Sequence, residues 1–572
     1  MCRERVRDLP DMNDSSTARS SGELVLVAMG GLGEIGMNAY LYGIGSPKAR
    51  QWLMVDLGLT FPHENEPGVD IVLPDLRFIE AEKGALAGLL LTHAHEDHIG
   101  AVLDMWPKLK CPIYATPFTA GMLAAKVVEN GNRVKLPITI VKMGSRFDVG
   151  PFDLELVTLA HSIPEPSGVI IRTDLGTVFH TGDWKFDATP LVGEPADEGR
   201  LAKLGADGVD VVICDSTNAL RHGRSPSETE VGASIAKIIK GAKRRVAVTS
   251  FASNVARVKA VSDAAEAAGR KLVISGRALH RVIQVAKDTG YLPENLSALD
   301  QQHFGYLEPH EVVALCTGSQ GEARAAMARI AEGEHPEIKL SRGDMVIFSS
   351  RPIPGNEIGI GKVQNSLARL GVEVITDSDA LVHVTGHPRR EELKQMYAFL
   401  KPKLVVPMHG EARHMEEHAK LAREAGVPET HVAYNGQMLR LLPRPAKVIA
   451  DVPVGRFYRD GKLIVPSVEG PVRERRRLSF AGIVCVAVAI DKHGEVCADP
   501  EVALDGVPQT TLDGRSMAEA IFKIVDGTLE SIPMKRRKDD KMVADALKRA
   551  VRAAVDQAWG KKPIVKVLVC LV

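Results

Sequence analysis

The chain has 572 residues, of which 45% are hydrophobic and 25% charged, a composition typical of a soluble globular protein with roughly two to four domains. Lysine plus arginine number 72, and so do aspartate plus glutamate, so nucleic-acid binding would have to come from local clustering rather than an overall basic excess. No apolar run reaches the roughly 20 residues needed to cross a bilayer, which excludes a membrane-spanning protein.

The N-terminal segment, residues 1–22, is polar and charged and lacks the apolar core of a secretory signal peptide. We therefore expect a disordered tail and a cytoplasmic protein. The 7 cysteines agree with this location, because they are odd in number and scattered without a Cys-x-x-Cys pair. That pattern indicates reduced thiols rather than a disulfide framework or a structural zinc site.

A glycine-rich stretch at residues 31–36 follows a strand-like run at 24–29 and matches the pattern G-x-G-x-x-G, with Asp56 further along the chain. This pattern marks a dinucleotide-binding fold only when the glycines open a helix. Here they precede further strand-like runs at 38–44 and 52–55. We therefore expect a meander of strands with a tight glycine turn beside a metal centre, and not a nicotinamide site.

The motif His-x-His-x-Asp-His follows an apolar, strand-like run that ends at Leu91. Imidazole and carboxylate suit a borderline divalent metal such as zinc, and a catalytic site combines such ligands with an open position for water. A solitary histidine here would more often be structural, but this density of ligands at a strand end is hard to explain by packing. The candidate ligands are His93, His95, Asp97 and His98.

Three more acids or imidazoles stand at the ends of strand-like runs, where loops can converge on one centre. They are Asp56, His161 and Asp183. With these residues the chain resembles the metallo-β-lactamase superfamily, whose metal ions lie at the edge of an αββα sandwich. The resemblance implies that residues 23–215 form the first part of such a sandwich.

Helix-like and strand-like segments alternate in residues 216–380, with helices at 228–240 and 255–268 and strands at 245–249 and 271–274. This alternation predicts a parallel α/β domain, inserted into the sandwich or appended to it.

Two apolar runs beyond this domain, in residues 381–442, end in turns that carry His387 and His409. A sandwich interrupted by an α/β domain and resumed by a His-Gly turn resembles the β-CASP group of nucleases. The resemblance implies that Asp215, His387 and His409 are the additional motifs of that group. It also implies RNA as substrate, since histidine at the position of His409 accompanies RNA-processing members and valine accompanies DNA-processing members.

Six motifs narrow the resemblance to the bacterial ribonuclease J family. They lie at residues 30–38, 92–100, 215–218, 318–322, 353–357 and 407–411. One departure follows His387, where a small residue is expected and Pro388, Arg389 and Arg390 stand instead. The proline stiffens the turn, and the two arginines add charge near the expected substrate path.

Hydrolysis of a phosphodiester needs a deprotonated water, stabilisation of the charge on phosphorus-bound oxygens, and an acid for the leaving oxygen; two divalent metals supply the first two. The resemblance implies three sets of ligands: His93, His95 and His161 for one ion, Asp97, His98 and His409 for the other, and Asp183 between them. Zinc is the expected metal, with manganese or magnesium as alternatives. Asp56 would orient a ligand imidazole.

His387 is the expected general acid or a contact to the phosphate, and its alternative role is that of a buried turn histidine. The turns that contain Thr385 and Gly386, and Ser319 and Gln320, could form anion nests or ordinary loops. Both turns resemble those that form the pocket for a 5′ monophosphate in this family. The resemblance therefore implies a 5′-to-3′ exonuclease in RNA processing and decay, with endonuclease cleavage left open.

Residues 443–477 are predicted to be a linker, because they are rich in proline and have few packing signals. The charge run at its end, residues 473–477, is either a solvated surface or an RNA contact. Residues 478–572 predict a compact β-α-β unit with strands at 481–490 and 564–572 and helices at 516–529 and 540–559. The resemblance implies that this unit forms a homodimer or homotetramer; an RNA-degrading assembly is a further possible partner.

Two other classes of function remain to be weighed. A small-molecule metallohydrolase would share the ligands from His93 to Asp183, but it would not need the α/β domain, His387 or His409. An RNA-binding scaffold with an inactive site would be expected to have lost ligands, and none is missing. We therefore expect a metal-dependent ribonuclease.

Overall fold

The computed structural model describes residues 22–353, 355–468 and 470–572, so the tail predicted at residues 1–22 lies outside the described residues except for Gly22. The chain forms two compact units. The first contains the residues up to Thr60 and Leu73–Gly455, and the second contains Phe61–Val72 and Arg456–Val572.

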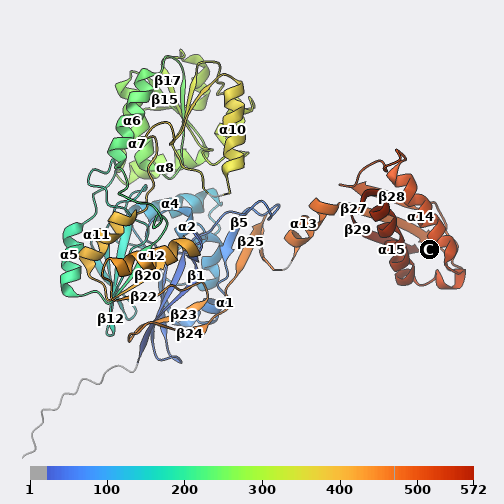
Figure 1. Ribbon diagram of the computed structural model, residues 1–572, viewed down its shortest axis with the longest axis horizontal. Coiled ribbons are helices and arrows are strands. Elements are labelled where there is room, and N and C mark those ends of the chain that lie inside the picture. The colour runs from blue at the N-terminus through green and yellow to red at the C-terminus, as the bar shows by residue number, and fades with distance from the viewer. Residues whose placement is uncertain (1–21, 354, 469) are drawn as a thin grey trace, which may run out of the picture. The chain divides into compact units, whose positions relative to one another are not determined.

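Two mixed β-sheets form the centre of the first unit (Figure 1). The strand order of the 8-stranded sheet is β24-β23-β1-β3-β4-β6-β7-β8, and that of the 7-stranded sheet is β22-β20-β13-β12-β11-β10-β9. The strands of the first are β1 (Glu23–Gly30), β3 (Ala39–Gly45), β4 (Gln51–Val55), β6 (Leu86–Leu90), β7 (Ile113–Ala115), β8 (Ile138–Ile140), β23 (Gln437–Leu442) and β24 (Lys447–Asp451). Those of the second are β9 (Arg146–Val149), β10 (Phe152–Thr158), β11 (Ser167–Thr173), β12 (Gly176–His180), β13 (Val211–Asp215), β20 (Leu404–Met408) and β22 (Glu429–Thr430).

One hydrophobic core joins the inner faces of the two sheets, with Leu26 and Leu53 from one sheet and Leu154 and Val169 from the other. Each fully buried aliphatic side chain contributes about 1.5–3 kcal/mol to the free energy of folding. Many such side chains fill this layer, so the sandwich is a stable support for the loops at its edge. A second core lies on the outer face of the 7-stranded sheet, beneath α5 (Glu198–Asp207), α11 (Arg390–Leu400) and α12 (Ala412–Glu424).

Helices α3 (Val102–Leu109) and α4 (Pro117–Glu129) bury apolar side chains such as Met105 and Phe118, and α4 contacts β8 of the 8-stranded sheet. The layers are therefore helix, sheet, sheet and helix, and the predicted αββα sandwich is confirmed.

A separate 6-stranded sheet forms the α/β domain, in the order β16-β15-β17-β14-β18-β19. Its strands are β14 (Val246–Thr249), β15 (Lys271–Ser275), β16 (Ala298–Asp300), β17 (Val312–Cys316), β18 (Met345–Phe348) and β19 (Glu373–Ile375), and every pairing is parallel. Helices α6 (Glu228–Gly241), α7 (Val255–Ala267), α8 (Arg277–Asp288) and α10 (Glu357–Arg369) surround the sheet (Figure 1). Parallel strands are buried on both faces, which explains the uninterrupted apolar runs of β14 and β17.

The glycine stretch at residues 31–36 opens no helix. β1, β3 and β4 form an antiparallel meander, as predicted, and β2 (Leu32–Gly33) pairs with β21 (Gly410–Glu411). Gly31 has φ of 93°, and a Cβ atom there would lie 2.2 Å from the Tyr40 hydroxyl oxygen, so only glycine fits this turn.

Residues 443–477 are not the linker that the sequence predicts. β24 pairs with β23 and extends the large sheet of the first unit. In the second unit β25 (Arg456–Asp460) and β26 (Leu463–Pro466) form a hairpin, and α13 (Pro471–Ala481) follows. The prediction failed because short β-branched runs such as Val448 and Ile449 pair as strands even though prolines flank them.

The C-terminal part of the second unit has a 3-stranded sheet in the order β28-β27-β29. β27 (Ile483–Ile490) and β29 (Ile564–Leu571) are parallel, and α14 (Met517–Ser531) and α15 (Asp540–Trp559) pack on one face of the sheet (Figure 1). The predicted β-α-β arrangement is confirmed, with β28 (Glu501–Asp505) as an additional strand. Among the described residues, no helix combines the length and apolarity needed to span a membrane.

Candidate metal centre

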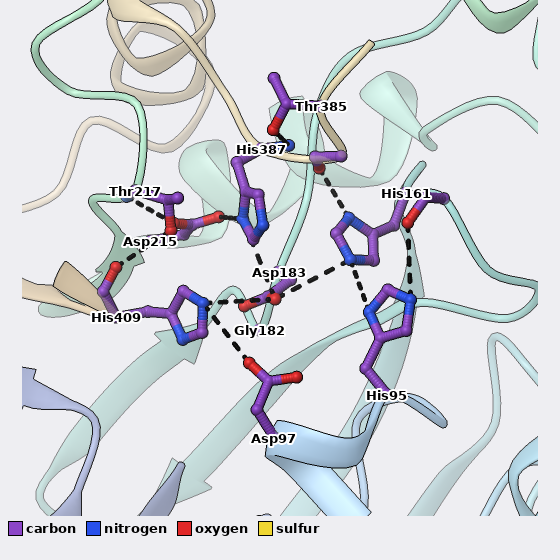
Figure 2. Close-up of polar contacts among 12 residues, drawn as sticks. His95, Asp97, His161, Gly182, Asp183, Asp215, Thr217, Thr385, His387 and His409 are labelled. Carbon is purple, nitrogen blue, oxygen red and sulfur yellow. Dashed lines mark hydrogen bonds and ion pairs between the residues drawn. The ribbon is translucent and has the colours of Figure 1, made fainter. Parts of the chain in front are cut away.

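The site lies where loops leave the carboxyl ends of several strands of the sandwich. His93 and His95 follow β6, and Asp97 and His98 lie in the short helix α2 (Glu96–Ile99). The remaining members follow other strands: His161 follows β10, Asp183 follows β12, Asp215 ends β13 and His409 follows β20. Figure 2 shows Asp183 at the centre of this group. Strands from distant parts of the sequence thus deliver their polar ends to one place, as the sequence predicts.

Asp183 and the three imidazoles of His93, His95 and His161 form the first cluster. His95 Nδ1 lies 3.1 Å from His93 Nε2 and 3.0 Å from His161 Nε2. Asp183 Oδ2 lies 3.8 Å from both of these Nε2 atoms. Three ring nitrogens and one carboxylate oxygen therefore face a common point.

Asp183 also belongs to the second cluster, which contains Asp97, His98 and His409. Its Oδ2 atom lies 3.2 Å from His98 Nε2 and 3.6 Å from His409 Nε2. Asp97 Oδ2 lies 3.6 Å and 3.7 Å from the same two nitrogens. The two clusters share one carboxylate and lie on either side of it (Figure 2).

The far ring nitrogens of three of these histidines are fixed by hydrogen bonds. His161 Nδ1 donates to the Gly386 carbonyl oxygen at 2.7 Å, and His98 Nδ1 donates to Asp56 Oδ2 at 2.7 Å. His409 Nδ1 donates to Asn38 Oδ1 at 2.9 Å. With the proton on Nδ1, each Nε2 atom presents a lone pair to the centre.

These lone pairs point at the carboxylate of Asp183, which is buried and whose Oδ1 atom has no hydrogen-bond partner among the described residues. Lone pairs and a carboxylate repel one another unless a cation, either a ring proton or a metal ion, lies between them, and a buried oxygen without a partner is costly. The imidazole and carboxylate donors therefore fit a divalent metal ion.

Burial and neighbouring charges determine the pKa values of the histidines in the two clusters. Burial, together with the neighbouring imidazoles, lowers the pKa of His93 and His161 well below the ordinary value. Burial also lowers the pKa of His95 to about 4, so all three rings are neutral at pH 7, the form that binds metal. Burial would lower the pKa of His98 too, but the carboxylates of Asp183, Asp97 and Asp56 outweigh it and raise that pKa.

His387 and Asp215 form a third group with Asp183. Asp215 is fully buried and accepts from His387 Nδ1 at 2.7 Å and from the Thr217 amide at 2.8 Å. The His387 ring stacks on that of His409, with centroids 5.4 Å apart. Burial acts to lower the pKa of His387, but Asp215 and Asp183 outweigh it and raise the pKa to about 9.

The other predicted site residues lie at varying positions around this centre. Asp56 sits behind His98 and also accepts from the Thr92 amide and hydroxyl, both at 2.8 Å. Gly386 lies against His161, and a Cβ atom there would be 2.2 Å from His161 Nδ1, so the loop needs glycine. The Thr385 hydroxyl accepts from Asn218 Nδ2 at 3.1 Å and from the His387 amide at 3.3 Å.

Ser319 and Gln320 make no hydrogen bond or ion pair with the clusters within the described part of the chain. Gln320 Oε1 instead accepts from the Ile353 amide at 2.8 Å, and Gln320 Nε2 donates to the Arg351 carbonyl oxygen at 3.0 Å. The side chain thus holds a neighbouring loop, and its contact with substrate stays a prediction.

Asn38 is a site residue that the sequence did not single out. It is fully buried, and its Oδ1 atom accepts from Tyr40 at 2.8 Å as well as from His409. Its Nδ2 atom lies 3.0 Å from His98 Nε2 and 3.1 Å from the Asp97 carbonyl oxygen. The available signal was its position at the end of the glycine turn that was expected beside the metal centre.

Four family models match the chain. They are described as the beta-lactamase superfamily domain (residues 66–247), the ribonuclease J beta-CASP domain (243–367), the Zn-dependent metallo-hydrolase RNA specificity domain (371–433) and the ribonuclease J C-terminal domain (470–572). Together they follow the order of the sandwich, the α/β domain and the C-terminal unit.

Several curated relatives are similar over nearly their whole length. A ribonuclease J of Sinorhizobium meliloti is 50% identical over 547 residues, which cover 96% of this chain and 97% of the relative. A ribonuclease J of Mycolicibacterium smegmatis is 37% identical, covering 95% and 96%, and one of Thermus thermophilus is 34% identical, covering 94% of each. A crystal structure of a protein of unknown function from Enterococcus faecalis V583 shares the fold, with a TM-score of 0.50, 15% identity and coverage of 73% of this chain and 99% of that one.

Proposed function

Because this chain belongs to the ribonuclease J family and is a metal-dependent ribonuclease, we propose that it trims RNA from the 5′ end toward the 3′ end with two bound divalent ions. The observation that carries the two-ion proposal is the single carboxylate of Asp183, which belongs to both clusters. Each cluster offers four donor groups, a number that suits zinc. The predominance of imidazole favours zinc over magnesium, with manganese as the alternative.

When bound, two such ions supply a deprotonated water at neutral pH and stabilise negative charge on the phosphoryl oxygens. The chain's own residues prepare the site for them. The imidazoles of His98, His161 and His409 are held by hydrogen bonds at Nδ1. Burial acts to raise the pKa of Asp183, but the positive charge of His409, His98 and His387 in their protonated forms outweighs burial and lowers that pKa, so the carboxylate is ionised. A preformed donor set of this kind binds ions without a large rearrangement.

We assign His387 as the proton donor to the leaving oxygen, which is the 3′ oxygen of the departing nucleotide. Its Nδ1 atom is anchored on Asp215, and within the described residues its Nε2 atom has no hydrogen-bond partner. The ring also stacks on His409, so it lies beside the centre at which the phosphoester bond breaks. Asp215 thereby acts as a positioning residue that orients the imidazole.

A preference for a 5′ monophosphate is supported by the loops beside the clusters. Thr385 and Gly386 lie in the turn that touches His161, and small-residue turns of this kind suit an anion nest. Ser319 and Gln320 are kept as candidate phosphate contacts, with the Gln320 amide donating to Glu322 Oε2 at 3.0 Å. Cations add to this preference. Burial lowers the pKa of Arg221, and so do the nearby guanidinium groups of Arg351 and Arg389; Arg351 is also paired with Asp377 Oδ2 at 3.2 Å. Such a group attracts phosphate.

The domain limits remain part of the proposal: a sandwich of residues 23–215 and 381–442, which β24 extends to Asp451, an inserted domain of 216–380, and a C-terminal domain from 478. We also propose a homodimer or homotetramer formed through the C-terminal domain, with an RNA-degrading assembly as a further partner. One face of its sheet supports this, because Cys485, Ala487 and Ala489 of β27 are half-exposed on the side away from the helices. A cytoplasmic location agrees with the 6 described cysteines, which are all free thiols.

The proposal is tested with zinc-loaded protein and end-labelled RNA that carries a 5′ monophosphate, a 5′ triphosphate or no phosphate, beside a matching DNA. We expect mononucleotides to appear first from the monophosphorylated RNA and none from the DNA. Cleavage at internal positions of the RNA, whatever group its 5′ end carries, would contradict the exonuclease assignment. The conclusion that the protein is a metal-dependent ribonuclease would still stand.

A further inference from the structure

The C-terminal part of the second unit contains a groove of about 460 Å³ that the catalytic proposal does not use. Its walls are helix α15 and strand β29, with Arg477 of α13 at the rim. The residues that line it are Arg477, Ala544, Asp545, Lys548, Arg552 and residues 563–568. All of them belong to the same compact unit.

One wall of the groove is an open sheet edge. β29 is a terminal strand of the sheet, and among the described residues it pairs only with β27. The Ile564 amide donates to the carbonyl oxygen of Gly482, just before β27, and the Val572 amide donates to that of Ile490 in β27, at 3.0 Å each. Since peptide groups along a strand alternate between its two sides, those of Val565, Val567 and Val569 face away from β27. This edge therefore offers a row of unpaired backbone donors and acceptors.

The groove is also strongly cationic. Arg477, Lys548, Arg552 and Lys566 line it, and Asp545 is the one acidic residue in its lining. Within the described part of the chain, none of the four cations forms an ion pair or a side-chain hydrogen bond with a protein group. Four unpaired cations along an open strand edge repel one another. An acidic ligand would relieve this repulsion, so the groove attracts one.

We propose that this groove binds an extended acidic segment of a partner protein, which adds to the sheet as a strand beside β29. The backbone of such a segment would pair with the free edge, and its carboxylates would meet Lys548 and Arg552 on one side and Lys566 on the other. Leu568, which is 62% exposed, gives the strand an apolar contact between the charges.

Two other occupants fit the groove less well. The lining residues contain no aromatic ring on which the bases of single-stranded RNA could stack. A second copy of the chain would bring its own Lys566 and Lys548 against the same cations, and like charges across an interface are unfavourable. An extended acidic peptide could pair with the free backbone groups of β29 and also neutralise the four cations.

The test uses the full-length protein and a fluorescent eight-residue probe of roughly alternating glutamate and valine, with binding followed by anisotropy at low and high salt. The double variant Lys548→Glu with Arg552→Glu reverses the groove's charge. Lys541→Glu with Arg549→Glu is the matched control, because both residues are exposed on α15 and do not line the groove. We expect binding to weaken at least tenfold in the groove variant and less than twofold in the control.

A second probe separates strand addition from simple charge attraction. Replacing the valines of the peptide by proline keeps its charge and removes half of its amide donors, so we expect binding to be lost. Equal binding of both peptides would overturn the proposal. It would also be overturned if a single-stranded oligouridylate, and not the peptide, bound in a manner sensitive to the groove variant, or if that variant abolished self-association while the peptide failed to bind.

Discussion

At the scale of single residues, the proposed metal centre depends on its candidate ligands and equally on the residues that orient those ligands by hydrogen bonds. Each of three histidines donates a hydrogen bond from Nδ1 that fixes its ring: His98 to Asp56, His161 to the Gly386 carbonyl oxygen and His409 to Asn38. His409 and Asp56 also have left-handed backbone, with φ of 50° and 64°, a conformation that costs a non-glycine residue about 1–3 kcal/mol. The fold holds both residues in this conformation, which places their side chains at the centre.

Asn38→Ala should selectively weaken the second cluster. It removes the acceptor of His409 Nδ1 and the amide beside His98, so we expect metal affinity to fall about 10–100-fold at that site. Plasma emission spectrometry after dialysis should show metal falling toward one ion per chain. Asn435→Ala is the control, because Asn435 bonds to Leu32 and Glu34 of the same turn but to no ligand. Equal metal loss in both variants would point to general damage of the turn.

His387→Gln should lower kcat about 10²–10⁴-fold, because glutamine cannot supply the proton that the leaving oxygen needs. Metal content should stay at the wild-type level, since His387 lies outside the two ligand clusters. Asp215→Asn should give a smaller loss in kcat, because it leaves the imidazole in place with a weaker anchor. Single-turnover cleavage of labelled RNA measures both. Unchanged cleavage by His387→Gln would remove this residue from the mechanism.

At the scale of elements, Glu155 joins β10 to two neighbours. It accepts from Arg172 of β11 at 2.6 Å and from Arg200 of α5 at 2.6 Å and 2.9 Å. The two hydrogen bonds from Arg200, and then the one from Arg172, outweigh burial and lower the pKa of the Glu155 carboxyl to about 2. This carboxylate therefore fastens helix α5 to the 7-stranded sheet that carries His161 and Asp183.

The lowered pKa of Glu155 predicts a dependence of stability on pH. Its unfolded pKa lies near 4.5 and its folded pKa near 2, so its contribution is complete above 4.5 and is lost as the pH falls toward 2. Glu155→Gln should cost about 1–3 kcal/mol at pH 7 and roughly half as much near pH 3. Urea unfolding at the two pH values measures the difference. A cost that does not change with pH would mean that charge is not the cause.

The sequence predicted elements with a strong pattern and missed those that depend on pairing. The alternation after residue 216 predicted a parallel domain, and strand ends predicted where His93, His161 and Asp183 converge. It did not predict β24, since a short run such as Val448 and Ile449 becomes a strand only because β23 is beside it. Asn38 was missed for a similar reason: its role depends on His409, which is distant in the chain.

At the scale of the whole molecule, the described chain divides into a catalytic unit and a C-terminal unit with separate cores. The proposed metal ligands all belong to the first unit, and the cationic groove belongs to the second. Charge reversal in the groove should therefore leave hydrolysis of a short RNA unchanged. Initial rates of mononucleotide release by Lys548→Glu with Arg552→Glu test this independence, and a large loss would show that the groove contributes to catalysis.

Removal of metal should abolish RNA hydrolysis and also lower the melting temperature of the first unit. Without a cation the neutral imidazoles of His93 and His161 face the carboxylate of Asp183 at 3.8 Å, so the empty first cluster is electrostatically strained. Differential scanning calorimetry before and after chelation measures this effect, and added zinc should restore both properties. A melting temperature unaffected by chelation would argue against a buried metal centre.

The most direct test of the account is a titration of metal-free protein with zinc, during which mononucleotide release from 5′-monophosphorylated RNA is followed. The sharing of Asp183 by two clusters predicts little activity with one ion bound and full activity as the second site fills. Full activity at one ion per chain, or no RNA cleavage with both sites filled, would contradict the central claim.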